Sequence, residues 1–165
     1  MITLRPAQPE DAGLILAFIR ELADYEHLAH EVQATEADLK AALFCTQPKA
    51  FCDLAEWNGT PAGFALWFYS FSTFKGRHGI YLEDLFVRPE HRGRGMGRAL
   101  LTHLARRCTA EQLGRLEWAV LDWNAPSIAF YEALGARPMG DWTVYRLTGD
   151  NLDALGGLEE ATCSS

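Results

Sequence analysis

A glycine-rich turn between an apolar run and an apolar-faced helix constrains the fold of this chain more than any other feature. The turn, Arg92–Gly97, carries alternating glycines and follows the apolar run Gly79–Val87. A helix is predicted from about Gly97 to Ala110, because Leu100 and Leu104 lie on one side at helical spacing. Glycines let a backbone approach a ligand closely, and the first N–H groups of a helix favour an anion. The pattern therefore predicts a strand–turn–helix unit suited to a phosphate group.

The turn does not match the usual nucleotide-binding patterns. A P-loop needs Gly-Lys-Ser/Thr, which is absent, and the alternating glycines depart from the G-x-G-x-x-G fingerprint of dinucleotide-binding folds. Arg92, Arg94 and Arg98 add positive charge to a chain with a formal net charge of −7. This local reversal of sign favours an anionic ligand over the alternative, a merely flexible turn.

Composition limits the class of protein. The chain has 165 residues, of which 48% are hydrophobic and 22% charged, which is typical of one globular domain. We expect one domain over residues 1–165, with a loose tail from about Gly156. The acidic balance disfavours a nucleic-acid partner and suits a cationic one. No apolar run approaches the roughly 18 residues of a membrane span, and no signal peptide is evident, so we expect a cytoplasmic protein without a membrane partner.

The cysteines and histidines give no metal-binding pattern. The four cysteines form no C-x-x-C pair, so we expect free thiols and neither a zinc site nor a disulfide framework. His27 and His30, beside Glu26 and Glu31, could imitate a metal site, but a solvated helix end explains them as well. We therefore expect no bound metal.

The order of elements predicts a mixed α/β (α+β) sheet with helices on both faces. A hairpin is expected at Asn58-Gly59, and the capping box Thr35–Asp38 should open a helix. Other helices are expected from Pro9 and from Pro126, with Gly135 just past the end of the latter. The predicted strands are Ile2–Arg5, Phe51–Trp57, Ala62–Phe71, Gly79–Val87, Leu116–Leu121 and Thr143–Leu147.

Beyond these patterns the sequence resembles a known family. Arg92-x-x-Gly95-x-Gly97 matches the Gln/Arg-x-x-Gly-x-Gly/Ala signature of the Gcn5-related N-acetyltransferase (GNAT) superfamily. The blocks Glu21–Glu26, Tyr81–Val87 and Trp123–Tyr131 resemble the diamine (spermidine/spermine) acetyltransferases, and the likeness runs from about Ile2 to Asn151. The resemblance implies a GNAT fold with a mostly antiparallel sheet, acetyl-CoA as co-substrate, a small amine as acceptor, and a homodimer.

The resemblance also implies site residues. Tyr131 matches the general acid that protonates the leaving CoA thiolate. The residues that would contact the cofactor are Leu85, Phe86, Val87, Arg92, Gly93, Arg94, Gly95, Met96, Gly97, Arg98, Asn124, Ala125, Pro126 and Ser127. The residues that would line the amine pocket are Tyr25, Glu26, Glu83, Glu117, Trp118 and Ala119.

Acetyl transfer from a thioester to an amine needs proton transfers that Glu83 and Tyr131 could perform. A free alkylamine titrates near about pH 10, so a base or a water chain must remove its proton at neutral pH. Strict alternation would place Glu83 with Tyr81 on one face of its strand and Asp84 on the other. A carboxylate inside a buried strand needs a reason. We predict that Glu83 recognises the amine and deprotonates it through water. The alternative for Glu83 is a structural hydrogen bond. The alternative for Tyr131 is an ordinary tyrosine packed in the core.

The acceptor side departs from the diamine enzymes. Asp122 and Ala125 stand where glutamates commonly occur, and Glu117 stands where a histidine does. Glu26, Glu31, Glu117 and Asp122 together still favour a cationic acceptor. We therefore expect an acetyl-CoA-dependent N-acetyltransferase for a diamine, polyamine or thialysine-like amine, acting by direct attack in a ternary complex. A peptide or protein N-acetyltransferase and a non-catalytic acyl-CoA-binding regulator are the alternatives.

Overall fold

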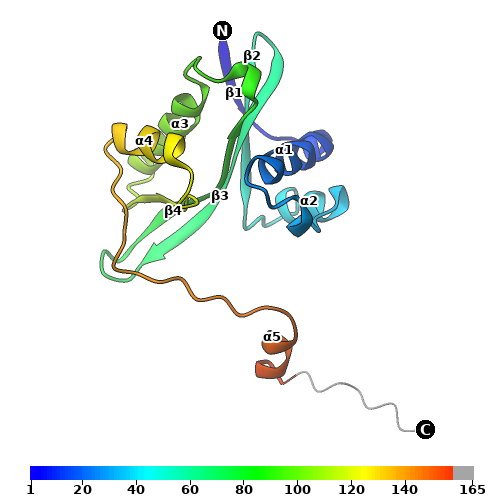
Figure 1. Cartoon of the computed structure of the whole chain (residues 1–165), viewed down its shortest axis with the longest axis vertical. Coiled ribbons are helices and arrows are strands. Elements are labelled where there is room, and N and C mark those ends of the chain that lie inside the picture. The colour runs from blue at the N-terminus through cyan, green and yellow to red at the C-terminus, as the bar shows by residue number, and fades with distance from the viewer. Residues whose placement is uncertain (158–165) are drawn as a thin grey trace, which may run out of the picture. The chain divides into compact units, whose positions relative to one another are not determined.

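The computed structural model describes residues 1–157, and the chain divides into two compact units, Met1–Asp122 and a second that begins at Trp123. The first unit holds one five-stranded sheet in the order β1-β2-β3-β4-β5 (Figure 1). The strands are β1 (Ile2–Pro6), β2 (Phe51–Trp57), β3 (Thr60–Ser72), β4 (Arg77–Val87) and β5 (Leu116–Trp118). Neighbouring strands are antiparallel except β4 and β5, which are parallel. The predicted mixed, mostly antiparallel sheet is confirmed.

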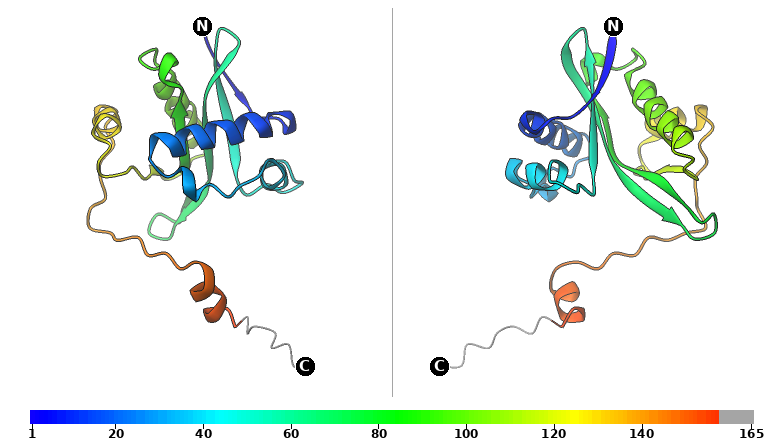
Figure 2. Two further views of the ribbon diagram at one scale, coloured as in Figure 1. Left: turned by 45° about the vertical axis from the view of Figure 1, so that its right-hand side comes forward. Right: turned by 180° about the vertical axis from the view of Figure 1, so that it is seen from behind.

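Helices cover both faces of this sheet. Helices α1 (Ala12–Tyr25) and α2 (Glu36–Leu43) lie on one face, and α3 (Met96–Ala110) lies on the other (Figure 2). The first unit also holds the short 3-10 turns η1 (Pro9–Asp11), η2 (Ala29–Glu31) and η3 (Pro89–His91). The second unit holds α4 (Ala125–Ala133) and α5 (Gly149–Leu155). In the described part of the chain, no helix is long and apolar enough to cross a membrane.

An aromatic stack fixes α1 against the sheet. The ring of Phe18 lies parallel to that of Phe64 on β3, with centroids 5.5 Å apart, and 6.3 Å from that of Phe86 on β4. All three side chains are buried, as are Ile15 and Leu22 of the same helix. Burial of such side chains contributes about 1.5–3 kcal/mol each, so α1 has one defined position on β3 and β4.

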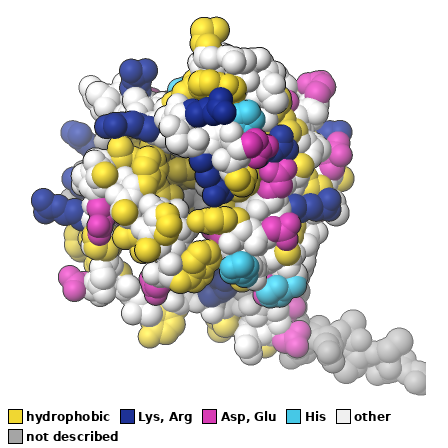
Figure 3. Space-filling model, turned by 45° about the horizontal axis from the view of Figure 1, so that its top comes forward, with side chains coloured by type: hydrophobic (Ala, Val, Ile, Leu, Met, Phe, Trp, Pro, Cys, Tyr) yellow, Lys and Arg dark blue, Asp and Glu magenta, His cyan; other side chains and the backbone are white. Residues whose placement is uncertain are grey.

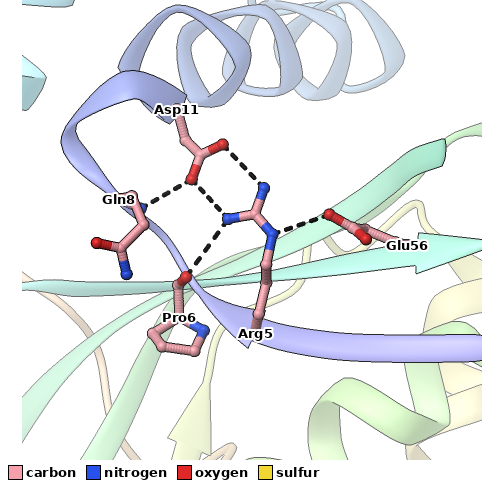
Figure 4. Close-up of polar contacts among 5 residues, drawn as sticks. All are labelled: Arg5, Pro6, Gln8, Asp11 and Glu56. Atoms are coloured by element: carbon pink, nitrogen blue, oxygen red, sulfur yellow. Dashed lines mark hydrogen bonds and ion pairs between the residues drawn. The ribbon is translucent and has the colours of Figure 1, made fainter. Parts of the chain in front are cut away.

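A charged cluster joins the end of β1 to the start of α1 (Figure 4). The guanidinium of Arg5 donates to both carboxylate oxygens of Asp11, at 2.7 and 2.9 Å, and to Oε1 of Glu56 at 2.8 Å. The backbone N–H of Gln8 also donates to Asp11, at 2.8 Å. The hydrogen bond from Arg5 lowers the pKa of Asp11 more than burial raises it. This carboxylate is therefore held in its charged form.

Locally encoded features form as predicted. Asn58 and Gly59, with φ values of 50° and 82°, make the turn between β2 and β3. Thr35 caps α2: its Oγ1 accepts from the N–H of Asp38, whose carboxylate accepts from the N–H of Thr35. Gly135, with φ of 88°, follows the end of α4.

The predictions fail towards the C-terminus. The predicted strand Thr143–Leu147 is wrong, since it has no strand partner among residues 1–157, and Val144 and Tyr145 are exposed. A strand needs a neighbour for its backbone N–H and C=O groups, which composition alone does not supply. For the same reason β5 ends at Trp118, earlier than the predicted Leu121. Helix α5 was not predicted, and most of the expected loose tail lies outside the described residues.

Candidate active site at the β4 bulge and the glycine-rich turn

Strand β4 contains a bulge at Glu83. Asp84 lies opposite Leu66 of β3, but the next pairing along β3 joins Trp67 to Leu82. Glu83 is therefore an extra residue on β4 without a directly opposed partner on β3. A bulge of this kind bends a strand and redirects the side chains around it.

The bulge overturns the predicted alternation. Before the bulge, Tyr81 opposes Phe68 of β3, and their ring centroids lie 5.2 Å apart. This pairing puts Tyr81 on the same face of the sheet as Asp84 and Phe86. Leu82 lies on the other face, with Leu85 and Val87. The exposures are also the reverse of those expected, because the Glu83 side chain is exposed and Asp84 is partly buried. The prediction of a buried Glu83 was wrong because one inserted residue shifts every later side chain to the opposite face.

Asp84 is the functional candidate that the sequence reasoning missed. Burial, together with the nearby negative charges of Glu83 and Glu26, raises its pKa to about 6. Glu26 follows the last residue of α1, and burial raises its pKa as well. The three carboxyl groups make a negative region suited to an ammonium group. The signal for Asp84 in the sequence was a pair of adjacent carboxylates inside an apolar strand. Because adjacent side chains of a strand point to opposite faces, both cannot lie on a single solvent-facing side.

One edge of β4 is open next to the bulge. β5 pairs with β4 only from Ile80 to Leu82, opposite Leu116 to Trp118. Within the described residues no strand follows beside β4 from Glu83 onwards on this edge. The predicted cofactor contacts Leu85, Phe86 and Val87 all lie in this segment. An extended ligand can therefore run along the strand where β5 has ended.

The glycine-rich turn leads from η3 into α3. Gly93 and Gly95 have φ values of 72° and 84°, and Gly95 is the residue that precedes the first turn of α3. A Cβ at either glycine would meet nothing within 4 Å, so the left-handed backbone, not crowding, requires glycine there. Arg94 and Arg98 are exposed beside them, and Met96 is buried. A helix N-terminus flanked by exposed arginines fits the pyrophosphate of a CoA-type ligand.

Aromatic rings hold two of the arginines. The Nε of Arg92 donates to the backbone oxygen of Val87 at 2.8 Å, and its Cζ lies 4.8 Å from the ring centroid of Tyr25. The Cζ of Arg94 lies 4.9 Å from the ring centroid of Trp57 on β2. The predicted acceptor residue Tyr25 therefore contacts the first residue of the predicted phosphate turn.

The remaining predicted acceptor residues lie on and after β5. The carboxylate of Glu117 pairs with Nε of Arg115 at 2.7 Å, so part of its charge is compensated. Trp118 ends β5, and Ala119 follows it, exposed. No group of three or more His, Cys, Asp or Glu side chains within residues 1–157 could hold a metal ion.

The second unit carries the other predicted residues. Asn124 precedes α4 and caps it, since its Oδ1 accepts from the N–H of Ser127 at 3.4 Å. Ala125 and Pro126 form the exposed first turn. Tyr131 lies on the same helix, partly buried, with its ring 5.4 Å from that of Phe130.

Comparisons with known proteins identify the family of the chain. Residues 16–136 match the acetyltransferase (GNAT) family. The chain is 37% identical to a thialysine N-epsilon-acetyltransferase of Bos taurus, over 94% of this chain and 98% of that protein. It is 31% identical to an L-ornithine N5-acetyltransferase of Arabidopsis thaliana, over 94% and 88%. A solved integron cassette protein from the mobile metagenome of V. cholerae matches with a TM-score of 0.78 and 26% identity, over 94% and 98%.

Proposed function

This chain belongs to the acetyltransferase (GNAT) family and is an N-acetyltransferase, and from that premise we propose that it moves an acetyl group from acetyl-CoA to a primary amine of a small cationic acceptor. The observation that carries the proposal is the juxtaposition, at the end of β4, of a phosphate-suited turn and a cluster of carboxyl groups. Similarity to thialysine and ornithine acetyltransferases supports an acceptor of the size of a diamine, polyamine or basic amino acid.

The cofactor residues have separate tasks in this proposal. Gly93, Gly95 and the N-terminus of α3 hold the pyrophosphate, with Arg94 and Arg98 adding positive charge. The open edge of β4 at Leu85 to Val87 offers backbone groups to the pantetheine arm. Acetyl-CoA supplies the acetyl group as a thioester. Asn124 to Ser127 border the cofactor in the family that the sequence resembles, and we assign them the same task.

The carboxyl groups act on the acceptor. The attacking nitrogen must lose a proton, because an ammonium group has no lone pair. Exposed Glu83 accepts this proton through water, while Asp84 and Glu26 favour a cationic acceptor at the bulge. The amine nitrogen forms a bond to the acetyl carbon, and the carbon–sulfur bond breaks. Tyr131 gives its phenolic proton to the departing thiolate, in a single ternary complex without an acetylated enzyme. The nitrogen, positively charged after the attack, loses a second proton to become the amide, and a proton taken up through water restores the phenol.

Release of CoA thiol tests the proposal. Acetyl-CoA is mixed with the protein and with diamines, polyamines, thialysine, ornithine, lysine or short peptides, and free thiol is followed. We expect release with a small cationic amine. Release only with peptides would instead identify a protein acetyltransferase, and binding of acetyl-CoA without release on any acceptor would favour a non-catalytic regulator. Absence of acetyl-CoA binding would contradict the proposal outright.

Removing the Tyr131 hydroxyl tests the acid. Tyr131→Phe should lower kcat by about 10²-fold or more, the usual contribution of a general acid, while the Kd for acetyl-CoA stays within about twofold. Phe130→Leu is the matched control, since it changes the adjacent ring of α4 without touching a proton donor. Equal kcat for Tyr131→Phe and wild type from pH 6 to pH 9 would remove Tyr131 from this role.

Substitution of Gly95 tests the turn. A residue with a Cβ at φ of 84° costs about 1–2 kcal/mol, so Gly95→Ala should weaken acetyl-CoA binding about tenfold. Gly140→Ala is the control, because Gly140 is outside the left-handed region and also has open space around it. Isothermal titration with CoA measures both. Equal affinities for the two variants would show that this conformation does not support the cofactor.

We also propose that both units belong to one acetyltransferase domain that works as a homodimer in the cytoplasm, without nucleic-acid or membrane partners. The family match crosses from the first unit into the second, which supports one domain. Phe71 and Phe74, 52% and 96% exposed at the tip of the β3–β4 hairpin, support contact with a second copy. Light scattering coupled to size exclusion measures the oligomeric state.

A further inference from the structure

The connection between β4 and α3 is joined to α1 at two points. Arg88, just after β4, donates to both carboxylate oxygens of Glu21 at 2.8 and 2.9 Å, and its Cζ lies 4.7 Å from the ring centroid of Phe18. Arg92 contacts Tyr25, which lies one helical turn beyond Glu21. These contacts run side by side, so the last two turns of α1 and the start of the glycine-rich turn are held together.

The guanidinium end of Arg92 makes one hydrogen bond and two ring contacts. Nε donates to the Val87 backbone oxygen at 2.8 Å, and the guanidinium carbon lies 4.8 Å from the Tyr25 ring centroid and 5.7 Å from that of Phe86. A planar guanidinium can combine a directed Nε–H bond with stacking on a ring, whereas the compact ammonium group of lysine cannot reproduce this combination. Arg92, although exposed, is therefore anchored between β4 and α1 in this structure.

Its neighbours on either side belong to two different parts of the proposed site. Tyr25 and Glu26, at the end of α1, are the proposed acceptor residues, and Gly93 follows Arg92 directly in the phosphate turn. We propose that Arg92 is a positioning residue that couples the acceptor side of the site to the cofactor side. Ordering the end of α1 then strengthens CoA binding, and CoA binding orders the end of α1. This inference rests on the proposed function, and the coupling is reciprocal because two linked binding equilibria must change each other by the same factor.

Arg94 provides a matched comparison. It lies in the same turn, carries the same charge and also stacks on an aromatic ring, but that ring is Trp57 at the end of β2. Substitution of Arg94 should therefore weaken phosphate binding without changing the contact with Tyr25 on α1. Replacing each arginine with lysine keeps its charge. Comparing Arg92→Lys with Arg94→Lys therefore distinguishes coupling through α1 from electrostatic attraction of the phosphate.

A double-mutant cycle on CoA binding tests the coupling without an acceptor. Isothermal titration gives the Kd of CoA for wild type, Tyr25→Leu, Arg92→Lys and the double variant. A cation–π contact at a partly exposed site corresponds to about two- to fivefold in an equilibrium constant. We expect each single variant to raise the Kd by about this factor, and the double variant to be no weaker than Arg92→Lys alone. Tyr25→Phe keeps the ring and should bind CoA like wild type.

The Arg94 cycle and a kinetic readout complete the test. For Tyr25→Leu combined with Arg94→Lys, the two effects on the CoA Kd should multiply, because Arg94 stacks on Trp57 of β2 whereas Tyr25 stacks with Arg92. With the acceptor found by thiol release, Arg92→Lys should raise the amine KM by about two- to fivefold with kcat within about twofold, while Arg94→Lys changes the KM of acetyl-CoA and not that of the amine. Thermal melting of each variant shows that it is folded.

The outcomes separate this inference from the proposed function. In one outcome, the wild type binds CoA while the effects of Tyr25→Leu and Arg92→Lys on the CoA Kd simply multiply in the double variant. This result would overturn the coupling and leave the acetyltransferase proposal intact. Equal rises of the amine KM for Arg92→Lys and Arg94→Lys would overturn it as well. Wild type that binds neither CoA nor acetyl-CoA would overturn both proposals together.

Discussion

Two carboxyl groups of the first unit have opposite surroundings. Asp11, where β1 meets α1, accepts hydrogen bonds from Arg5 and from the backbone of Gln8, and Arg5 lowers its pKa. Asp84, at the β4 bulge, is affected by burial and by the negative charges of Glu83 and Glu26, and all three raise its pKa. Among these influences none favours the charged form of Asp84. The first carboxyl group stabilises the fold, and the second is kept at a cost to it.

The difference distinguishes a structural charge from a functional one. A buried charge that only supports a fold is normally paired, since desolvation without a partner costs several kcal/mol. Asp84 lies at a bulge, beside two further acids and an open strand edge, and has no ion-pair partner among residues 1–157. This arrangement is explained if a cationic acceptor supplies the partner. The space-filling view of one face of the molecule shows acidic, basic and histidine side chains interspersed with apolar ones (Figure 3).

Substitution of Asp84 should change stability more than substitution of Asp11. Because the folded pKa of Asp84 lies near 6, above the unfolded value of about 4, the folded chain retains a proton that the unfolded chain has lost between those pH values. Its contribution to stability is therefore present at low pH and is lost as the pH rises through 6. Asp84→Asn should raise the free energy of unfolding by about 2 kcal/mol at pH 7.5, and the gain should vanish below about pH 4.

Urea denaturation from pH 4 to pH 8 measures this gain. Asp24→Asn, at an exposed position on α1, is the control and should change stability by no more than about 0.5 kcal/mol at any pH. The Asp84→Asn variant should also turn over the amine more slowly, since stability at this position opposes function. A variant less stable than wild type at pH 7.5 would mean that Asp84 has a stabilising partner and is structural like Asp11.

Asp11 should give a smaller effect of opposite sign. Its pKa is lowered in the folded state, so its contribution is present above the unfolded pKa of about 4 and is lost as the pH falls through the folded value. Asp11→Asn should lower the free energy of unfolding by about 1 kcal/mol at pH 7, with little change in kcat. The same urea series measures it. An undiminished difference from wild type at pH 2 would show that the loss arises from packing and not from the ion pair with Arg5.

The charged neighbours of Asp84 should have smaller effects, on its pKa. Of its two charged neighbours, Glu83 raises the pKa of Asp84 more than Glu26 does. Glu83→Gln should lower that pKa by a few tenths, and Glu26→Gln by less, in line with weak interactions between partly solvated charges. NMR titration of the Asp84 side-chain carboxyl carbon resolves both changes. The reverse order would place Glu26 closer to Asp84 in solution than the structure does.

Local features of the fold and site could be predicted because neighbouring residues determine them. Asn58-Gly59 accepts left-handed backbone, Thr35 caps the helix that follows it, and Gly93 and Gly95 permit the turn before α3. Each depends on backbone preference or a hydrogen bond within a few residues. The segment Thr143–Leu147 shows the limit of such reasoning, because its strand-like composition meets no neighbouring strand in the described chain.

The anion-suited turn, the order of most elements and the likeness to the acetyltransferase family follow from the amino-acid sequence alone. Which carboxylate of Glu83-Asp84 is the more buried follows from the packing of the strands, because it depends on how β4 pairs with β3 across the bulge at Leu66 and Trp67. The stacking of Arg92 on Tyr25, more than sixty residues away in the chain, also follows from tertiary packing. Strand register and long-range stacking arise from packing of distant segments, and no pattern within a single segment encodes them.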